Sequence, residues 1–254
     1  HYILVKRACG CGAAAGCCDM RGAELSSGVA VSAELLPPKQ PLTSDFERGL
    51  EAMRHGRTEE ALAYFGGWLS THPNDPAALT NVANLRLRSG AFAAAVEGYR
   101  QALAVAPKSA AAWSGLGNAL NELGRFDESI AAHDRAIELT RGRDRVAHYN
   151  RAGALKAAGR LDEALAGYRQ SLKLKPDDPE ALFHTSLVLL QKGDFREGWP
   201  LYEVRWKVPP LESPPSIAPR WTGERMPGAS LLLFGEQGFG DAIQFVRFAR
   251  LARQ

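Results

Sequence analysis

A glycine-rich segment near the end of the sequence, GEQGFGDA, contains residue types that could hold an anionic ligand. Its candidate ligand-binding positions are Gly235, Gln237, Gly238 and Gly240. Glycines let a backbone approach a ligand closely, and backbone N–H groups at the start of a helix favour negative charge. The apolar run at residues 231–234 predicts a buried strand of a parallel sheet before this loop. The sequence therefore predicts a strand, a ligand-binding loop and a helix.

Two nucleotide-binding motifs are excluded at this loop. Asp241 and Ala242 stand where a Walker A loop needs lysine and then serine or threonine, so the loop lacks the groups that contact the β- and γ-phosphates and Mg²⁺. The glycines also lack the GxGxxG spacing of a dinucleotide-binding turn. Asp241 is followed three residues later by Gln244, and DAIQ resembles a capping box in which the aspartate accepts backbone N–H bonds.

A second candidate site consists of asparagines in the middle of the chain. They are Asn81, Asn84, Asn118, Asn121 and Asn150. An asparagine amide both donates and accepts hydrogen bonds, so a row of them could pair with a peptide backbone almost independently of the peptide sequence. The alternative is that they are tolerated polar residues on a solvated surface. The elements that carry them decide whether they share one face.

Those elements are repeats, marked by glycines at a nearly constant interval. The glycines are Gly56, Gly90, Gly124, Gly159 and Gly193, with spacings of 34, 34, 35 and 34 residues. Such a period is typical of a solenoid. Five residues after each glycine comes a small residue, and four residues later an aromatic ring or histidine: Phe65, Tyr99, His133, Tyr168 and Tyr202. Small residues let two helices approach closely, and the ring fills the space on the same face. Each unit is therefore predicted to be a helical hairpin with its glycine in the turn.

The repeat resembles the tetratricopeptide repeat (TPR), through its period, its closing prolines and the segment AAWSGLGNAL at residues 111–120. The resemblance covers residues 42–206 and implies an all-α solenoid of about five hairpins. A protein or peptide partner would lie on the concave face formed by the first helices. The asparagines are similar to the ladder in the superhelix of O-linked N-acetylglucosaminyltransferases, although Gly115 and His184 interrupt the series.

Composition restricts the remaining possibilities. The chain has 254 residues, with 31 Lys and Arg against 28 Asp and Glu, and no basic run. This argues against nucleic acid as a partner, and no segment has the roughly twenty apolar residues needed for a membrane span. All four cysteines lie within residues 9–18, without the spacing of a zinc site, and we expect no metal.

Residues 1–41 are predicted to be a disordered or non-native tail. A cytoplasmic location is expected, because the tail has no continuous apolar segment after its positive charges.

After the repeats, residues 207–229 are proline-rich and predict a linker. The segments GWPLYEVRW, PRWTGE and FGEQGFGDAIQFVRF resemble, in this order, bacterial TPR glycosyltransferase-like proteins related to the heptosyltransferases. That family implies a GT-B architecture of two Rossmann-like lobes, a nucleotide-sugar donor held by the second lobe, and a catalytic role for Asp241 as a general base. Residues 230–254 would then be the first β-α unit of an incomplete glycosyltransferase-like domain.

The resemblance implies a scaffold that presents an acceptor to a glycosyltransferase-like domain in a longer protein. Residues 1–254 would by themselves be inactive and bind no cofactor, because the donor site would lie in the second lobe. The alternative is a non-enzymatic TPR adaptor with a degenerate α/β appendage.

Overall fold

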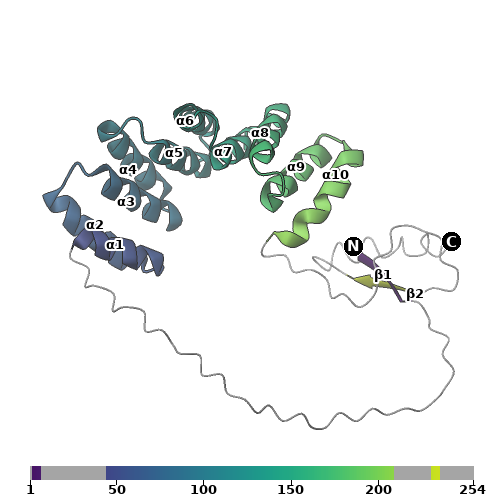
Figure 1. Cartoon of the computed structure of the whole chain (residues 1–254), viewed down its shortest axis with the longest axis horizontal. Helices are drawn as coiled ribbons and strands as arrows, with labels where there is room; N and C mark the ends of the chain where they lie inside the picture. Colours follow the sequence, from purple (N-terminus) through teal and green to yellow (C-terminus); the bar gives the residue numbers. More distant parts are fainter. Residues whose placement is uncertain (1, 7–43, 209–229, 235–254) are drawn as a thin grey trace, which may run out of the picture. The chain divides into compact units, whose positions relative to one another are not determined.

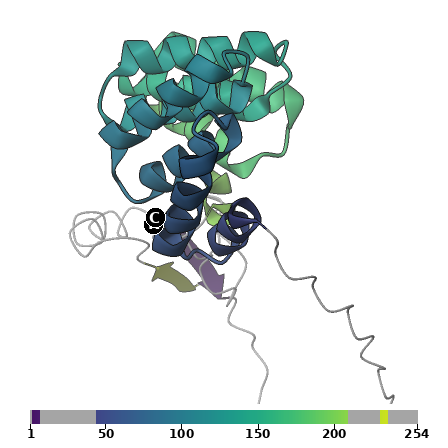
Figure 2. The same cartoon turned by 90° about the vertical axis from the view of Figure 1, so that its left-hand side faces the viewer.

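The computed structural model describes residues 2–6, 44–208 and 230–234. Residues 44–208 fold into five helical hairpins that follow one another in an arc, with the first helix of each hairpin on the inner side (Figure 1). The helices are α1 (Asp45–Arg54), α2 (Thr58–Thr71), α3 (Pro76–Arg88), α4 (Phe92–Val105), α5 (Ala110–Glu122), α6 (Phe126–Leu139), α7 (Arg145–Ala157), α8 (Leu161–Leu174), α9 (Pro179–Gln191), α10 (Phe195–Tyr202) and the 3-10 helix η1 (Glu203–Lys207). The helix axes of the first hairpins are tilted relative to those of the later hairpins (Figure 2). The predicted all-α solenoid of five hairpins is confirmed.

The turn within each hairpin depends on its glycine. All five repeat glycines have φ between 70° and 85°, a left-handed conformation that other residues adopt only with strain. The next residue donates its backbone N–H to a carbonyl in the last turn of the first helix, as from Arg125 to Leu120 at 2.9 Å. This is the hydrogen-bond pattern of a Schellman motif, which ends one helix and starts the next within a few residues.

The core is formed by the small residues and the rings that recur at equivalent positions in each repeat. Phe65, Tyr99, His133 and Tyr168 are all at most 1% exposed, and the small residues five positions after the turn glycines are also buried. Each ring packs between the two helices of its hairpin and the next hairpin, so burial in one repeat depends on its neighbour.

The third and fourth hairpins are joined differently from the others. Arg141 stands where the other units have proline, and it adopts φ 53°, followed by Gly142 at φ 70°. Asp144 then accepts hydrogen bonds from the backbone N–H groups of Val146 and Ala147, at 2.8 and 3.1 Å, and so begins α7. The extra residue is absorbed in the turn, and α7 has the same thirteen residues as α5 and α9.

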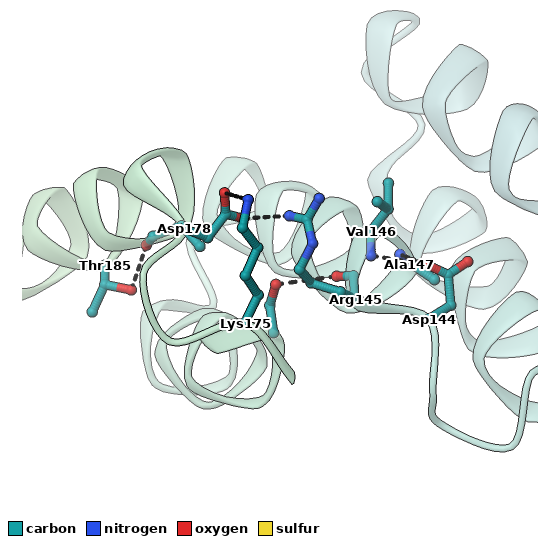
Figure 3. A network of polar contacts seen from close by, with 9 residues as sticks. Asp144, Arg145, Val146, Ala147, Lys175, Asp178 and Thr185 are labelled. Carbon is teal, nitrogen blue, oxygen red and sulfur yellow. Dashed lines mark hydrogen bonds and ion pairs between the residues drawn. The ribbon is translucent and has the colours of Figure 1, made fainter. Parts of the chain in front are cut away.

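A polar network links the fourth and fifth hairpins (Figure 3). Asp178 at the start of α9 is 5% exposed and receives ion pairs from Arg145 of α7 and from Lys175, the latter at 3.4 Å. Ser171 of α8 donates a hydrogen bond to the Arg145 carbonyl at 3.1 Å. A buried carboxylate is stable only when it is paired, so this network fixes α7 and α9 against each other.

Two strands are described outside the helices. β1 (Tyr2–Lys6) and β2 (Ser230–Phe234) pair antiparallel, with Leu4 opposite Leu232. The strand expected near residues 231–234 is present, but its described partner is antiparallel, so the parallel sheet predicted there is not what the structure shows. β1 lies within residues 1–41, and its sequence YILVK has high β-propensity. The rest of the disordered or non-native tail predicted there lies outside the described residues and stays a prediction. The helix expected after β2 lies outside the described residues, and a β-α unit is not shown.

Candidate functional site

A groove of about 750 Å³ runs along the inner side of the central hairpins. Its lining includes three asparagines, five aromatic or histidine rings and one lysine: Phe92 from α4, Asn118 and Asn121 from α5, His133 from α6, Tyr149, Asn150 and Lys156 from α7, Tyr168 from α8 and His184 from α9. Side chains from three successive first helices therefore meet on one surface. The groove combines amides that can pair with a backbone and rings that can contact apolar groups.

The structure brings together three of the five asparagines expected on the concave face. Asn118, Asn121 and Asn150 line the groove, whereas Asn81 and Asn84 do not. Asn84 accepts a hydrogen bond from the hydroxyl of Tyr99 at 2.5 Å. Its side-chain oxygen is therefore already engaged in holding a buried ring, and Asn84 has a structural contact that the sequence pattern did not indicate.

The interruption of the asparagine series at Gly115 has a steric cause. A Cβ atom at Gly115 would lie 2.4 Å from Cε1 and 2.7 Å from the hydroxyl oxygen of Tyr99. Tyr99 is fully buried, so the ring occupies the space that any side chain at position 115 would need. Only glycine fits there, so the series of asparagines is interrupted at position 115 because the buried Tyr99 ring leaves no room for an amide side chain.

His133 is also one of the residues that line the groove, and it takes the place that tyrosine has in the neighbouring hairpins. It is 1% exposed, and neither Nδ1 nor Nε2 has a hydrogen-bond partner among the described residues. Burial lowers the pKa of the imidazole to about 4, while Asp134 raises this pKa and Arg151 lowers it by smaller amounts. His133 is therefore neutral at pH 7 and packs against Gly117 as an apolar ring would.

Three rings form a cluster at one end of the groove. Tyr149 lies edge-on to Tyr168 and to His184, each with ring centroids 5.6 Å apart, and Tyr168 stacks on His184 at 5.8 Å. Burial raises the pKa of Tyr149 to about 12 and also raises the pKa of Tyr168. Both hydroxyls therefore stay protonated over the physiological range and can donate hydrogen bonds.

Lys156 is half-buried beside this cluster. Its ammonium nitrogen lies 3.4 Å from Nδ1 of His184, which accepts the hydrogen bond because an ammonium only donates. Burial lowers the pKa of Lys156, and burial followed by the charge of Lys156 lowers the pKa of His184 to about 4. Neither residue was expected to bind ligand. Lys156 follows Asn121 by 35 residues, so its place in the repeat was the available signal.

The predicted glycine-rich loop site falls elsewhere in the chain. Gly235, Gln237, Gly238, Gly240 and Asp241 lie outside the described residues. Within residues 2–6, 44–208 and 230–234, no group of three or more histidine, cysteine, aspartate or glutamate residues could hold a metal ion. No helix in the same ranges is long and apolar enough to cross a membrane.

Comparisons with known proteins agree with the repeat architecture. Two profiles, both described as tetratricopeptide repeat, match residues 46–99 and 108–177. The fold is similar to that of the MamA fragment from Desulfovibrio magneticus RS-1, with a TM-score of 0.59 and 18% identity over 65% of this chain and 95% of that one. It is also similar to YrrB, described as a TPR protein with an unusual peptide-binding site, with a TM-score of 0.54 and 19% identity over 65% of this chain and 85% of that one.

The alignment with one bacterial relative is longer than the repeat array. Protein FlbA of Caulobacter vibrioides is 30% identical over 223 residues, which cover 83% of this chain and 36% of FlbA. The chain therefore spans about a third of the length of this relative. The period, the hairpin geometry and both profile matches lead to one assignment: the protein is a tetratricopeptide-repeat protein.

Proposed function

We propose that the helical array is a protein-interaction scaffold that binds an extended polypeptide along the groove of α5, α7 and α9. The observation that carries this proposal is the meeting of Asn118, Asn121 and Asn150 on one hollow surface. The Oδ1 atom of Asn121 is shielded from solvent without a hydrogen-bond partner among the described residues, and a donor from a ligand would offset that cost. The peptide-binding site ascribed to YrrB, which has a similar fold, supports the same use of the surface.

Replacing Asn118 or Asn150 by alanine should weaken peptide binding about fivefold per substitution, because each lost hydrogen bond costs on the order of 1 kcal/mol. The probe is a cellulose-bound array of random dodecapeptides, incubated with the full chain. Affinities for the captured sequences are then measured by fluorescence anisotropy.

Asn74→Ala is the matched control, because Asn74 lies in the exposed turn before α3, away from the groove. It should leave affinity unchanged. Equal affinities for wild type, Asn118→Ala and Asn150→Ala, with unchanged circular dichroism, would place the binding surface elsewhere.

We propose further that, in a longer cytoplasmic protein, the groove presents an acceptor to a glycosyltransferase-like domain that uses a nucleotide-sugar donor. The support is the resemblance of residues 234–248 and of the two segments before them to that family. The second candidate is a non-enzymatic adaptor. Its support is that the described residues of the repeats form a groove by themselves.

The aspartate of the glycine-rich loop distinguishes these two candidates. In the full-length protein, Asp241→Asn should reduce sugar transfer at least about a hundredfold if the carboxylate is a general base. Asparagine caps helices about as well as aspartate, so stability should not change. Transfer is measured with a radiolabelled nucleotide sugar. A folded Asn variant at full rate would assign Asp241 to helix capping.

A further inference from the structure

The groove contains an opening where one repeat departs from the others. Gly153 occupies the position that Asn84 and Asn118 have in earlier hairpins, 35 residues after Asn118. A Cβ atom at Gly153 would meet only the hydroxyl of Tyr168, at 3.8 Å. The other inner-face glycines differ, because a Cβ at Gly115 or Gly117 would collide with a buried ring. Gly153 therefore leaves space on the groove floor.

The missing side chain also frees a hydroxyl. In the second hairpin, the Tyr99 hydroxyl donates to Asn84 at 2.5 Å. In the fourth hairpin, Tyr168 is the equivalent ring, and no hydrogen bond of its hydroxyl occurs within residues 44–208. The hydroxyl faces the opening above Gly153, so it can donate to a group that enters from the groove.

Lys156 supplies a positive charge at the same place. Many lysines and arginines lie within 4 Å of a carboxylate, whereas Lys156 has no such ion pair among the described residues. Its one polar contact there is the neutral His184 ring. A half-buried ammonium without an anion is costly, and an anionic ligand would offset that cost.

We propose that the space above Gly153 is a subsite for the carboxylate side chain of an aspartate or glutamate in the bound polypeptide. Lys156 and the Tyr168 hydroxyl would donate to the carboxylate, and the rings of Tyr149 and His184 would flank it. A single negative charge fits one lysine, and the exposed Glu122 on the same groove disfavours a more highly charged group such as a phosphoryl. This inference rests on the proposed peptide-binding function.

The test uses the same array of random dodecapeptides with the full chain. Captured sequences should be enriched in aspartate or glutamate at one fixed position. For the tightest such peptide, exchanging the acid for its amide should weaken binding to wild type about tenfold. The same exchange should have no effect on the Lys156→Met variant, because the partner of the carboxylate is gone.

Lys173→Met is the matched control, since Lys173 on α8 is exposed and does not line the groove. It should keep the tenfold discrimination. Gly153→Leu fills the opening without removing charge and should abolish the discrimination as well. Capture without acidic preference, or a preference that survives in Lys156→Met, would overturn the subsite while leaving the peptide groove intact. Absence of any captured peptide would overturn both.

Discussion

Gly115→Ala is expected to destabilise the array by about 2 kcal/mol, although alanine is the better helix former. The added methyl would lie 2.4 Å from the Tyr99 ring, which is fully buried and holds a hydrogen bond to Asn84. Overpacking of this kind costs about 1–3 kcal/mol, and displacing the ring would also break the hydrogen bond. The helix-propensity gain of about 1 kcal/mol offsets only part of this.

Gly153→Ala is the matched control, with the same substitution on the inner face of a helix of the same length. Its methyl would meet only the Tyr168 hydroxyl at 3.8 Å, so there is no steric cost. The higher helix propensity of alanine should then raise stability by about 1 kcal/mol. The two variants should thus differ by roughly 3 kcal/mol in urea unfolding followed by circular dichroism. A gain in both variants would show that Tyr99 does not pack against α5 as the structure has it.

Acidification from pH 7.5 to pH 4.5 should cost the wild type roughly 2.5 kcal/mol more than the His133→Phe variant. Burial lowers the pKa of native His133 from 6.5 to about 4. Below pH 6.5 the unfolded chain therefore binds a proton that the native state does not, and stability falls as the pH approaches 4. The loss of stability caused by His133 is therefore nearly zero above pH 6.5, and it reaches its full size below the native pKa of about 4.

Phenylalanine keeps the ring and removes the two nitrogens that have no partner among the described residues, so the variant should also be more stable at pH 7.5. His55→Phe is the control, because His55 is an exposed cap residue of α1. Unfolding is followed in urea at both pH values, and comparing variants cancels the common titration of surface carboxylates. Parallel pH dependence of wild type and His133→Phe would mean that His133 is protonated in the native state.

The candidate site could be predicted only in part. An asparagine in a given repeat column was expected to face the groove, and this is how Asn118, Asn121 and Asn150 were found. Asn84 follows the same pattern but is bound to Tyr99, a contact between helices that the spacing within one helix does not show. Lys156 and His184 are 28 residues apart and meet because adjacent hairpins pack, so neither stands out in the sequence.

The sequence by itself determined the repeat, because a glycine every 34 or 35 residues fixes the turns and the small and aromatic columns fix which helix faces are buried. These are local requirements of backbone conformation and helix periodicity, and the same residue types meet them in every repeat. Only the tertiary structure decided which polar side chains remain available to a ligand. A hydroxyl, an amide or an ammonium is free or engaged according to what the neighbouring hairpin places beside it: Asn84 beside Tyr99 is engaged, whereas the Tyr168 hydroxyl above Gly153 faces an open groove.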